Sequence, residues 1–190
     1  MHVISRIALL GGLLLLPAAC SSDDDFGKAP LVCPAVGVLS DASALRVFGD
    51  GTGRDQANTA YELEFMRANL LECELKKGEM TATIRFEARA RTGPAAPSNE
   101  YEYPYFVALL NPDNEVISKD LRKGTVKFKS GKAETFFAQE YDDIKFTVPE
   151  GRDGLGFEIL VGFQLTREQI ELKRAQDAAP KPGPDLIMQK

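Results

Sequence analysis

Paired carboxylates are the side chains of this chain that come closest to a catalytic constellation. Glu62 and Glu64 are two residues apart, and Glu140, Asp142 and Asp143 lie close together in the sequence. A glycoside hydrolase needs two carboxylates that flank the scissile bond. Residues two apart on an extended strand project from the same face, where their charges are solvated. The spacing therefore predicts exposed strand faces, and we predict that the protein is not an enzyme.

Metal and phosphate chemistry have weaker candidates. Gly49–Asp55 has the glycine spacing of a phosphate loop, but no G-K-[ST] follows it, and it lacks the ligand alternation of a calcium loop. The triplet Asp23–Asp25 has no further ligands nearby and is typical of a solvated spacer. We predict no metal and no cofactor. Gly49–Asp55 is interpreted as a flexible connection that could serve as a contact loop.

Three alternating tyrosines are the candidate ligand-binding residues. Tyr101, Tyr103 and Tyr105 would line one face of an extended strand, where exposed rings could stack on sugars. Val107 and Leu109 continue the same parity, which favours burial of that face over exposure. A glycan-binding row and a core row both remain open at this point.

The first 19 residues are typical of a secretory signal peptide. Arg6 precedes the apolar run Ile7–Leu16, and the small residues Ala18 and Ala19 follow it. The run is too short to span a bilayer, which takes about 20 residues. Cleavage after residue 19 would remove His2, the only histidine. The mature chain would then have no imidazole for a triad, a general base or a zinc site.

Leu16–Cys20 resembles the lipobox of bacterial lipoproteins, in which the cysteine is acylated, with palmitate among the chains added, and becomes the new N-terminus. Pro17 departs from the pattern, which prefers leucine there. The resemblance implies lipidation of Cys20, and Ser21 in place of aspartate implies sorting to the outer membrane, facing the periplasm. Two or three fatty chains give stable anchoring. The polar residues 20–30 would then form a tether.

The other two cysteines favour a structural disulfide. Cys33 and Cys73 lack C-x-x-C spacing and a neighbouring histidine, and disulfides persist in an oxidising compartment. The chain has a net charge of −5, which argues against nucleic acid as a partner. Its length suits one domain with its own core.

Alternating hydrophobicity predicts a mostly β domain over residues 31–176. Met80–Ala90 forms the clearest strand and makes a hairpin with Tyr61–Leu75, which is one bulged strand or two strands. Seven to nine such segments favour an antiparallel immunoglobulin-like β-sandwich, with a small barrel as the alternative. Thr166–Gln169 has capping-box spacing and predicts a short C-terminal helix. The tail 177–190 has no period and is predicted to be mobile. Further strands are expected at Tyr105–Leu110, 115–118, 125–129, 134–139, 144–148 and Gly156–Leu165.

Three stretches resemble a family of small outer-membrane lipoproteins of Gram-negative bacteria. They are Cys33–Ser43, which begins C-P-A-V-G-V-L, Pro104–Val107, and Ile159–Thr166, which reads I-L-V-G-F-Q-L-T. The resemblance covers most of residues 31–176. It implies an envelope lipoprotein with one β-rich domain, and it supplies no site residues.

The sequence thus predicts a non-catalytic, membrane-anchored envelope lipoprotein that binds or scaffolds part of a periplasmic or outer-membrane assembly. Its expected partners are the membrane, through the N-terminal lipid, and an envelope protein. The alternative is a glycan- or peptidoglycan-binding module that uses Tyr101, Tyr103 and Tyr105.

Overall fold

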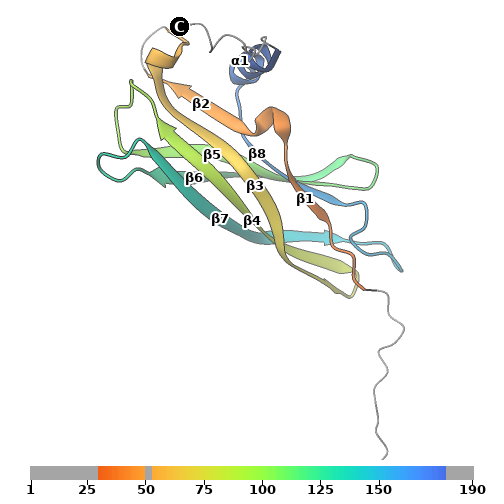
Figure 1. The fold of residues 1–190 in the computed structure, drawn as a ribbon. Coiled ribbons are helices and arrows are strands. Elements are labelled where there is room, and N and C mark those ends of the chain that lie inside the picture. Colours follow the sequence, from red (N-terminus) through yellow and green to blue (C-terminus); the bar gives the residue numbers. More distant parts are fainter. Residues whose placement is uncertain (1–29, 50–52, 179–190) are drawn as a thin grey trace, which may run out of the picture. The chain divides into compact units, whose positions relative to one another are not determined.

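The protein is described by a computed structural model that covers residues 30–49 and 53–178 (Figure 1). Two four-stranded sheets lie face to face, with strand orders β1-β8-β5-β6 and β2-β3-β4-β7. The strands are β1 Ala35–Val38, β2 Ala44–Phe48, β3 Thr59–Lys76, β4 Glu79–Thr92, β5 Glu100–Leu110, β6 Val116–Lys127, β7 Glu134–Thr147 and β8 Glu158–Phe163. Short 3₁₀ turns lie at η1 Ser40–Ala42 and η2 Gln56–Asn58, and α1 spans Arg167–Ala178.

The predicted β-sandwich with a short C-terminal helix is confirmed. All strand pairs are antiparallel except β1 with β8, which run parallel. Within the described residues, no helix is long and apolar enough to cross a membrane. The expected signal peptide 1–19, the lipidation site Cys20, Asp23–Asp25 and nearly all of the tail 177–190 lie outside the described residues.

The β3–β4 hairpin follows from local sequence. The alternation of apolar and polar residues in β4 places every second side chain in the core. Lys77 and Gly78 form the two-residue turn, with φ angles of 52° and 80°. Positive φ at both central residues matches the twist of antiparallel strands, and glycine adopts it without steric cost. β3 is one strand of 18 residues whose register shifts at Phe65/Arg67 and Leu70/Glu72.

Two strands differ from the prediction in length. β6 joins the segments expected at 115–118 and 125–129, and β7 joins those expected at 134–139 and 144–148. In β7, Tyr141 pairs with Ile84 and Ile144 pairs with Ala82, so two residues of β7 oppose a single residue of β4. This β-bulge breaks the period of two, and the sequence therefore looked like two strands.

Proline lacks a ladder donor and is usually found on edge strands. Pro104 nevertheless belongs to β5, which lies between β8 and β6. The β8 ladder ends at the pair Tyr105 and Phe163, and Pro104 lies just beyond it. Its carbonyl accepts a hydrogen bond from Gln164 N at 3.0 Å. The proline is tolerated because its nitrogen lies where β8 has already ended.

An aromatic cluster fills the space between the sheets. Phe163 of β8 stacks on Phe65 of β3, with ring centroids 4.1 Å apart. Phe86 contacts Phe65 edge to face at 5.1 Å, and Tyr103 contacts Phe163 in the same way at 5.9 Å. Each of these rings is at most 5% exposed. The contacts join strands from both sheets, so this cluster holds the sandwich together.

The disulfide between Cys33 and Cys73 connects the segment before β1 to β3, with a sequence separation of 40. Closing a loop of this length restricts the unfolded chain by about 4 kcal/mol in the chain-entropy model, and measured losses are commonly 2–4 kcal/mol. We expect the double variant Cys33→Ser, Cys73→Ser to lose about 2–4 kcal/mol in free energy of unfolding.

Denaturant unfolding monitored by circular dichroism measures this loss, with the unsubstituted protein under reducing conditions as the comparison. Equal midpoints for the double variant and the oxidised protein would contradict a stabilising role.

Candidate functional site

The three tyrosines of the candidate glycan row lie inside the sandwich. Tyr101, Tyr103 and Tyr105 are 9%, 1% and 2% exposed. Tyr103 donates its hydroxyl to Gln139 Oε1 at 3.2 Å, and Gln139 Nε2 donates to the hydroxyl oxygen of Tyr105 at 2.7 Å. Burial raises the pKa of Tyr103 well above its ordinary value. The rings are core residues, and a sugar could stack on them only if the sandwich opened.

Four of the five candidate carboxylates, those of Glu62, Glu64, Glu140 and Asp143, face a cation across the surface. Glu64 bonds Arg89 on the neighbouring strand, and Glu140 lies 3.6 Å from Arg85. Asp143 accepts a hydrogen bond from Arg122 at 3.2 Å. Among the described residues, no group of three His, Cys, Asp or Glu side chains is arranged to hold a metal ion. These four carboxylates are therefore spread along cross-strand ion pairs.

A second polar cluster lies where the edges of β6 and β7 meet. Asp120 accepts hydrogen bonds from the Tyr141 hydroxyl and from Arg122 Nε, the latter at 2.7 Å. These bonds, chiefly the one from Tyr141, hold the pKa of Asp120 below its usual range. The neighbouring hollow encloses only about 50 Å³. Charged side chains at sheet edges prevent pairing with further strands, and we assign this cluster to that structural role.

A concave surface with a partly apolar lining lies between α1 and the outer face of β2, β3 and β4, and we name it the α1 groove. It encloses about 240 Å³. Its polar lining carries both signs of charge, and its apolar lining comes from β2, β3 and α1. The lining residues are Ala44, Leu45, Arg46, Glu62, Leu63, Glu64, Arg89, Arg91, Gln169, Leu172 and Lys173.

Local sequence starts α1 beside β2. The predicted capping box forms, because Gln169 N donates to Thr166 Oγ1 at 3.3 Å and Thr166 N donates to Gln169 Oε1 at 2.8 Å. Gln169 Nε2 also donates to the Arg46 carbonyl at 3.4 Å, which occupies an acceptor on the edge strand β2. Ile170 packs against the core. The helix thus forms one wall of the groove.

Two ion pairs hold the helix at longer range. Arg174 bonds Asp41 at 2.7 Å, and Arg54 bonds Glu168 at 3.1 Å. Both pairs are exposed, so each contributes little to stability. They bring together residues more than 100 positions apart in the chain. The position of the groove wall is therefore set by tertiary contacts.

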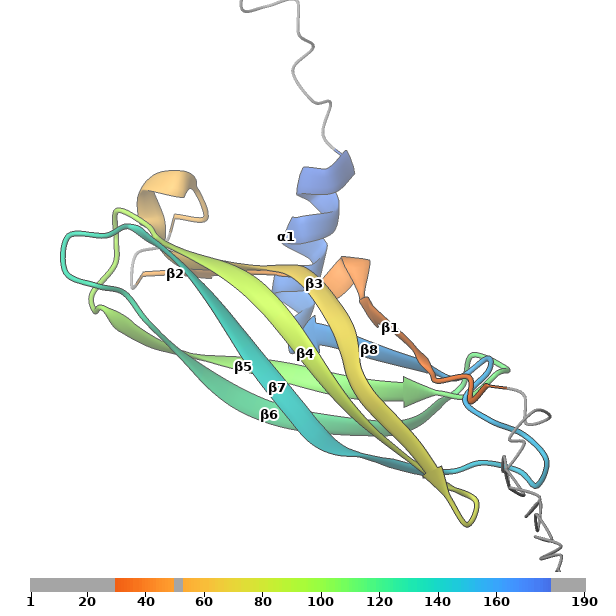
Figure 2. The same ribbon diagram turned by 60° about the horizontal axis from the view of Figure 1, so that its bottom comes forward.

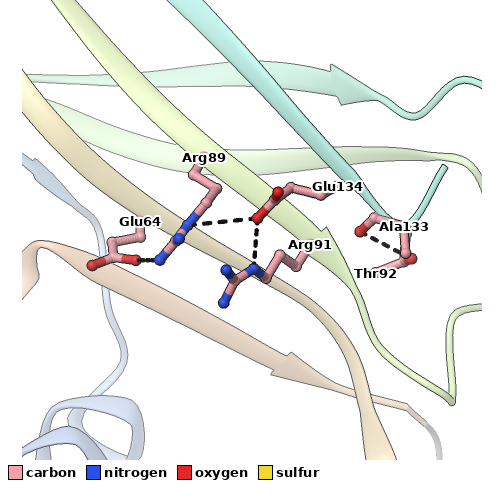
Figure 3. Close-up of polar contacts among 6 residues, drawn as sticks. All are labelled: Glu64, Arg89, Arg91, Thr92, Ala133 and Glu134. Atoms are coloured by element: carbon pink, nitrogen blue, oxygen red, sulfur yellow. Dashed lines mark hydrogen bonds and ion pairs between the residues drawn. The ribbon is translucent and has the colours of Figure 1, made fainter.

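Figure 3 shows the charged side of the groove on β3, β4 and the end of β7. Arg89 lies between Glu64, which it bonds, and Glu134, whose carboxylate is 3.9 Å away. Arg91 bonds the same Glu134 at 2.8 Å. The hydrogen bond to Glu134 is the main cause that raises the pKa of Arg91. The arginines stay charged and point along the sheet surface.

Exposed ion pairs of this kind are weak, so an incoming charged group can replace one partner at little cost. Leu45 and Leu63 line the groove but are only 2% and 1% exposed, so its accessible apolar side chains are those of the half-buried Ala44 and Leu172. Leu172 lies on the helix wall and also lines an adjoining hollow of about 380 Å³, which extends past Arg54 and Phe48. The two hollows share the lining residues Arg46, Gln169 and Leu172, so they adjoin each other along β2.

No protein-family model matches the chain, and no curated protein or solved structure matches it either. The sequence alone did not single out Arg46 or Arg91, whereas Leu172 is at a helical position expected to cover an edge or end of the sandwich. The sequence feature that could have indicated these arginines is the placement of opposite charges on neighbouring strands. No local pattern indicated that α1 would lie against them.

Proposed function

We propose that the protein is a non-catalytic envelope lipoprotein that binds a polypeptide segment of another envelope component in the α1 groove. The observation that carries the proposal is the groove itself, which combines the half-buried apolar residues Ala44 and Leu172 with ion pairs that a ligand can exchange. The N-terminal sequence supports anchoring at the outer membrane through Cys20.

A polypeptide suits the groove better than a small molecule does. Sites for drug-sized ligands usually enclose about 300–1,000 Å³ and bury most of the ligand. This groove is smaller and continues into an open neighbouring hollow. Arg91 and Glu64 on its rim can pair with groups of either sign. An extended segment with one apolar side chain against Leu172 and flanking charges matches this lining.

Site-specific photo-crosslinking in cells tests the proposal. A photoreactive residue in place of Leu172 is expected to form a discrete adduct with an envelope protein. The same residue in place of Leu121, which is 59% exposed on the other sheet, is the matched control. Because Arg91 is exposed, Arg91→Glu should leave the fold intact while reversing the charge beside the groove.

Loss of the Leu172 adduct in the Arg91→Glu background, at equal expression, would support recognition by the groove. Identical adducts from positions 172 and 121, or a Leu172 adduct that persists after Arg91→Glu, would refute it. Adducts with glycan alone would instead show that the α1 groove binds glycan and not a polypeptide.

A further inference from the structure

We infer that one end of the sandwich lies on the surface of a bilayer, with apolar side chains from its loops inserted between the lipid headgroups. This inference rests on the lipid anchor in the proposed function. We name this region the apolar end and define it by the exposed residues Leu31, Val32, Val116, Ile117 and Leu155. It lies where β1 begins, where β5 turns into β6 and where β7 connects to β8.

The apolar end exposes side chains that folding normally buries. Leu155 is 70% exposed, Val116 60%, Ile117 49%, Leu31 42% and Val32 38%. Single exposed apolar residues are common, but several on neighbouring loops indicate a contact surface. Figure 2 shows the start of the described chain, the β5–β6 turn and the β7–β8 loop together at this end.

Hydrogen bonds join the first described segment to the β7–β8 loop. Asp153 Oδ2 accepts from Val32 N at 3.3 Å, and Asp153 Oδ1 accepts from Leu155 N at 2.9 Å. Gly154 N donates to the Val32 carbonyl at 2.8 Å. The carboxylate of Asp153 thereby binds backbone groups of both segments. This arrangement holds Val32 and Leu155 close together and presents Leu155 outward.

The β5–β6 turn is held against the same loop. A Cβ atom on Gly156 would lie 3.1 Å from Pro112 Cβ, so the two segments are in close contact. Gly156 also has a φ of 83°, which favours glycine. Val116 follows this turn and pairs with Leu110. The apolar residues of the turn therefore belong to the same end as Leu155.

The position of the anchor selects a bilayer as the occupant of this surface. Cys20 stands 11 residues before Leu31, and a chain of that length reaches at most about 40 Å when extended. Leu31 belongs to the apolar end, so this end is the part of the domain nearest to the lipidated residue along the chain. The disulfide of Cys33 ties the segment to β3. A bilayer that holds Cys20 is thus always within reach of Leu155.

The charges on the loops of the apolar end favour insertion of apolar side chains over electrostatic attraction to lipid headgroups. The loops of this end carry Asp113, Glu115 and Glu150 beside Arg152, so anionic lipids would not attract them. Loop side chains alone bind bilayers weakly, but a tether keeps their local concentration high. We therefore expect the contact on zwitterionic lipid and only for the tethered domain. β8 runs away from this end toward α1, which leaves the α1 groove clear of the lipid surface.

Tryptophan fluorescence tests the inference directly, because the chain contains no tryptophan. The mature chain, with Cys33 and Cys73 oxidised, is coupled through its Cys20 thiol to a maleimide lipid in phosphatidylcholine vesicles. Leu155→Trp places a single reporter at the apolar end. Phe136→Trp is the matched control, because Phe136 is 61% exposed on the outer face of β7.

Brominated phosphatidylcholine is expected to lower the fluorescence of Leu155→Trp at least about twofold, since interfacial side chains sit about 5–10 Å deep. The fluorescence of Phe136→Trp is expected to stay unchanged. Adding Val32→Glu to Leu155→Trp should reduce the quenching. No quenching at position 155, or equal quenching at 155 and 136, would overturn the inference. Since the coupling is chemical, the result does not depend on whether Cys20 is acylated in cells.

Discussion

Replacing Phe163 by alanine is expected to lower the free energy of unfolding by about 3–5 kcal/mol. Phe163 is 0% exposed and contacts Phe65 of the opposite sheet and Tyr103 of the adjacent strand. Its loss would leave a cavity that the two closely packed sheets can fill only by shifting toward each other. Urea unfolding followed by circular dichroism gives the free energy from the midpoint and the slope.

Phe136→Ala is the matched control, because it removes the same side chain from a strand position that is 61% exposed. Its free energy of unfolding should change by at most about 0.5 kcal/mol. Similar losses for the two variants would show that Phe163 does not lie in the core that joins the sheets.

Replacing Cys20 by serine is expected to move the protein from the membrane fraction to the soluble periplasmic fraction. The lipobox resemblance of Leu16–Cys20 implies that the attachment depends on acyl chains carried by Cys20. Two or three chains give stable anchoring, and their loss leaves only the weak contact proposed for the apolar end. Fractionation with metabolic labelling by palmitate measures both the location and the modification.

Ser21→Asp is the control for this experiment. It retains Cys20 and is expected to stay in the membrane fraction with its label, while the lipoprotein resemblance implies a shift toward the inner membrane. A Cys20→Ser protein that still carries label and sediments with membranes would contradict lipidation at this residue.

Several elements could be predicted because their signals are local. The alternation in Met80–Ala90 and the Thr166–Gln169 capping box depend on residues only a few positions apart, and both appear as expected. The Cys33–Cys73 disulfide followed from cysteine count and compartment, and it is present. β1 and β2 were not singled out, since strands of four and five residues carry too little periodicity.

The tyrosine row shows the limit of a periodic pattern. Alternation placed Tyr101, Tyr103 and Tyr105 on one face, but a period of two does not say which side of the sheet is covered. The packing of Phe163 and the partner Gln139 decide that these rings are buried. The bulge at Asp142 and Asp143 likewise depends on pairing with β4 and interrupts an alternation that would otherwise continue.

The sequence by itself determined the expected export signal, the mostly β class of the domain and the start of its helix, because each depends on neighbouring residues. Only the tertiary structure brought α1 to β2 and joined Val32 to Asp153, contacts that span 123 and 121 positions. Contacts between residues this far apart form when the two sheets pack around one core. The periodicity of a short stretch of sequence does not predict them. The α1 groove and the apolar end are both products of this long-range packing.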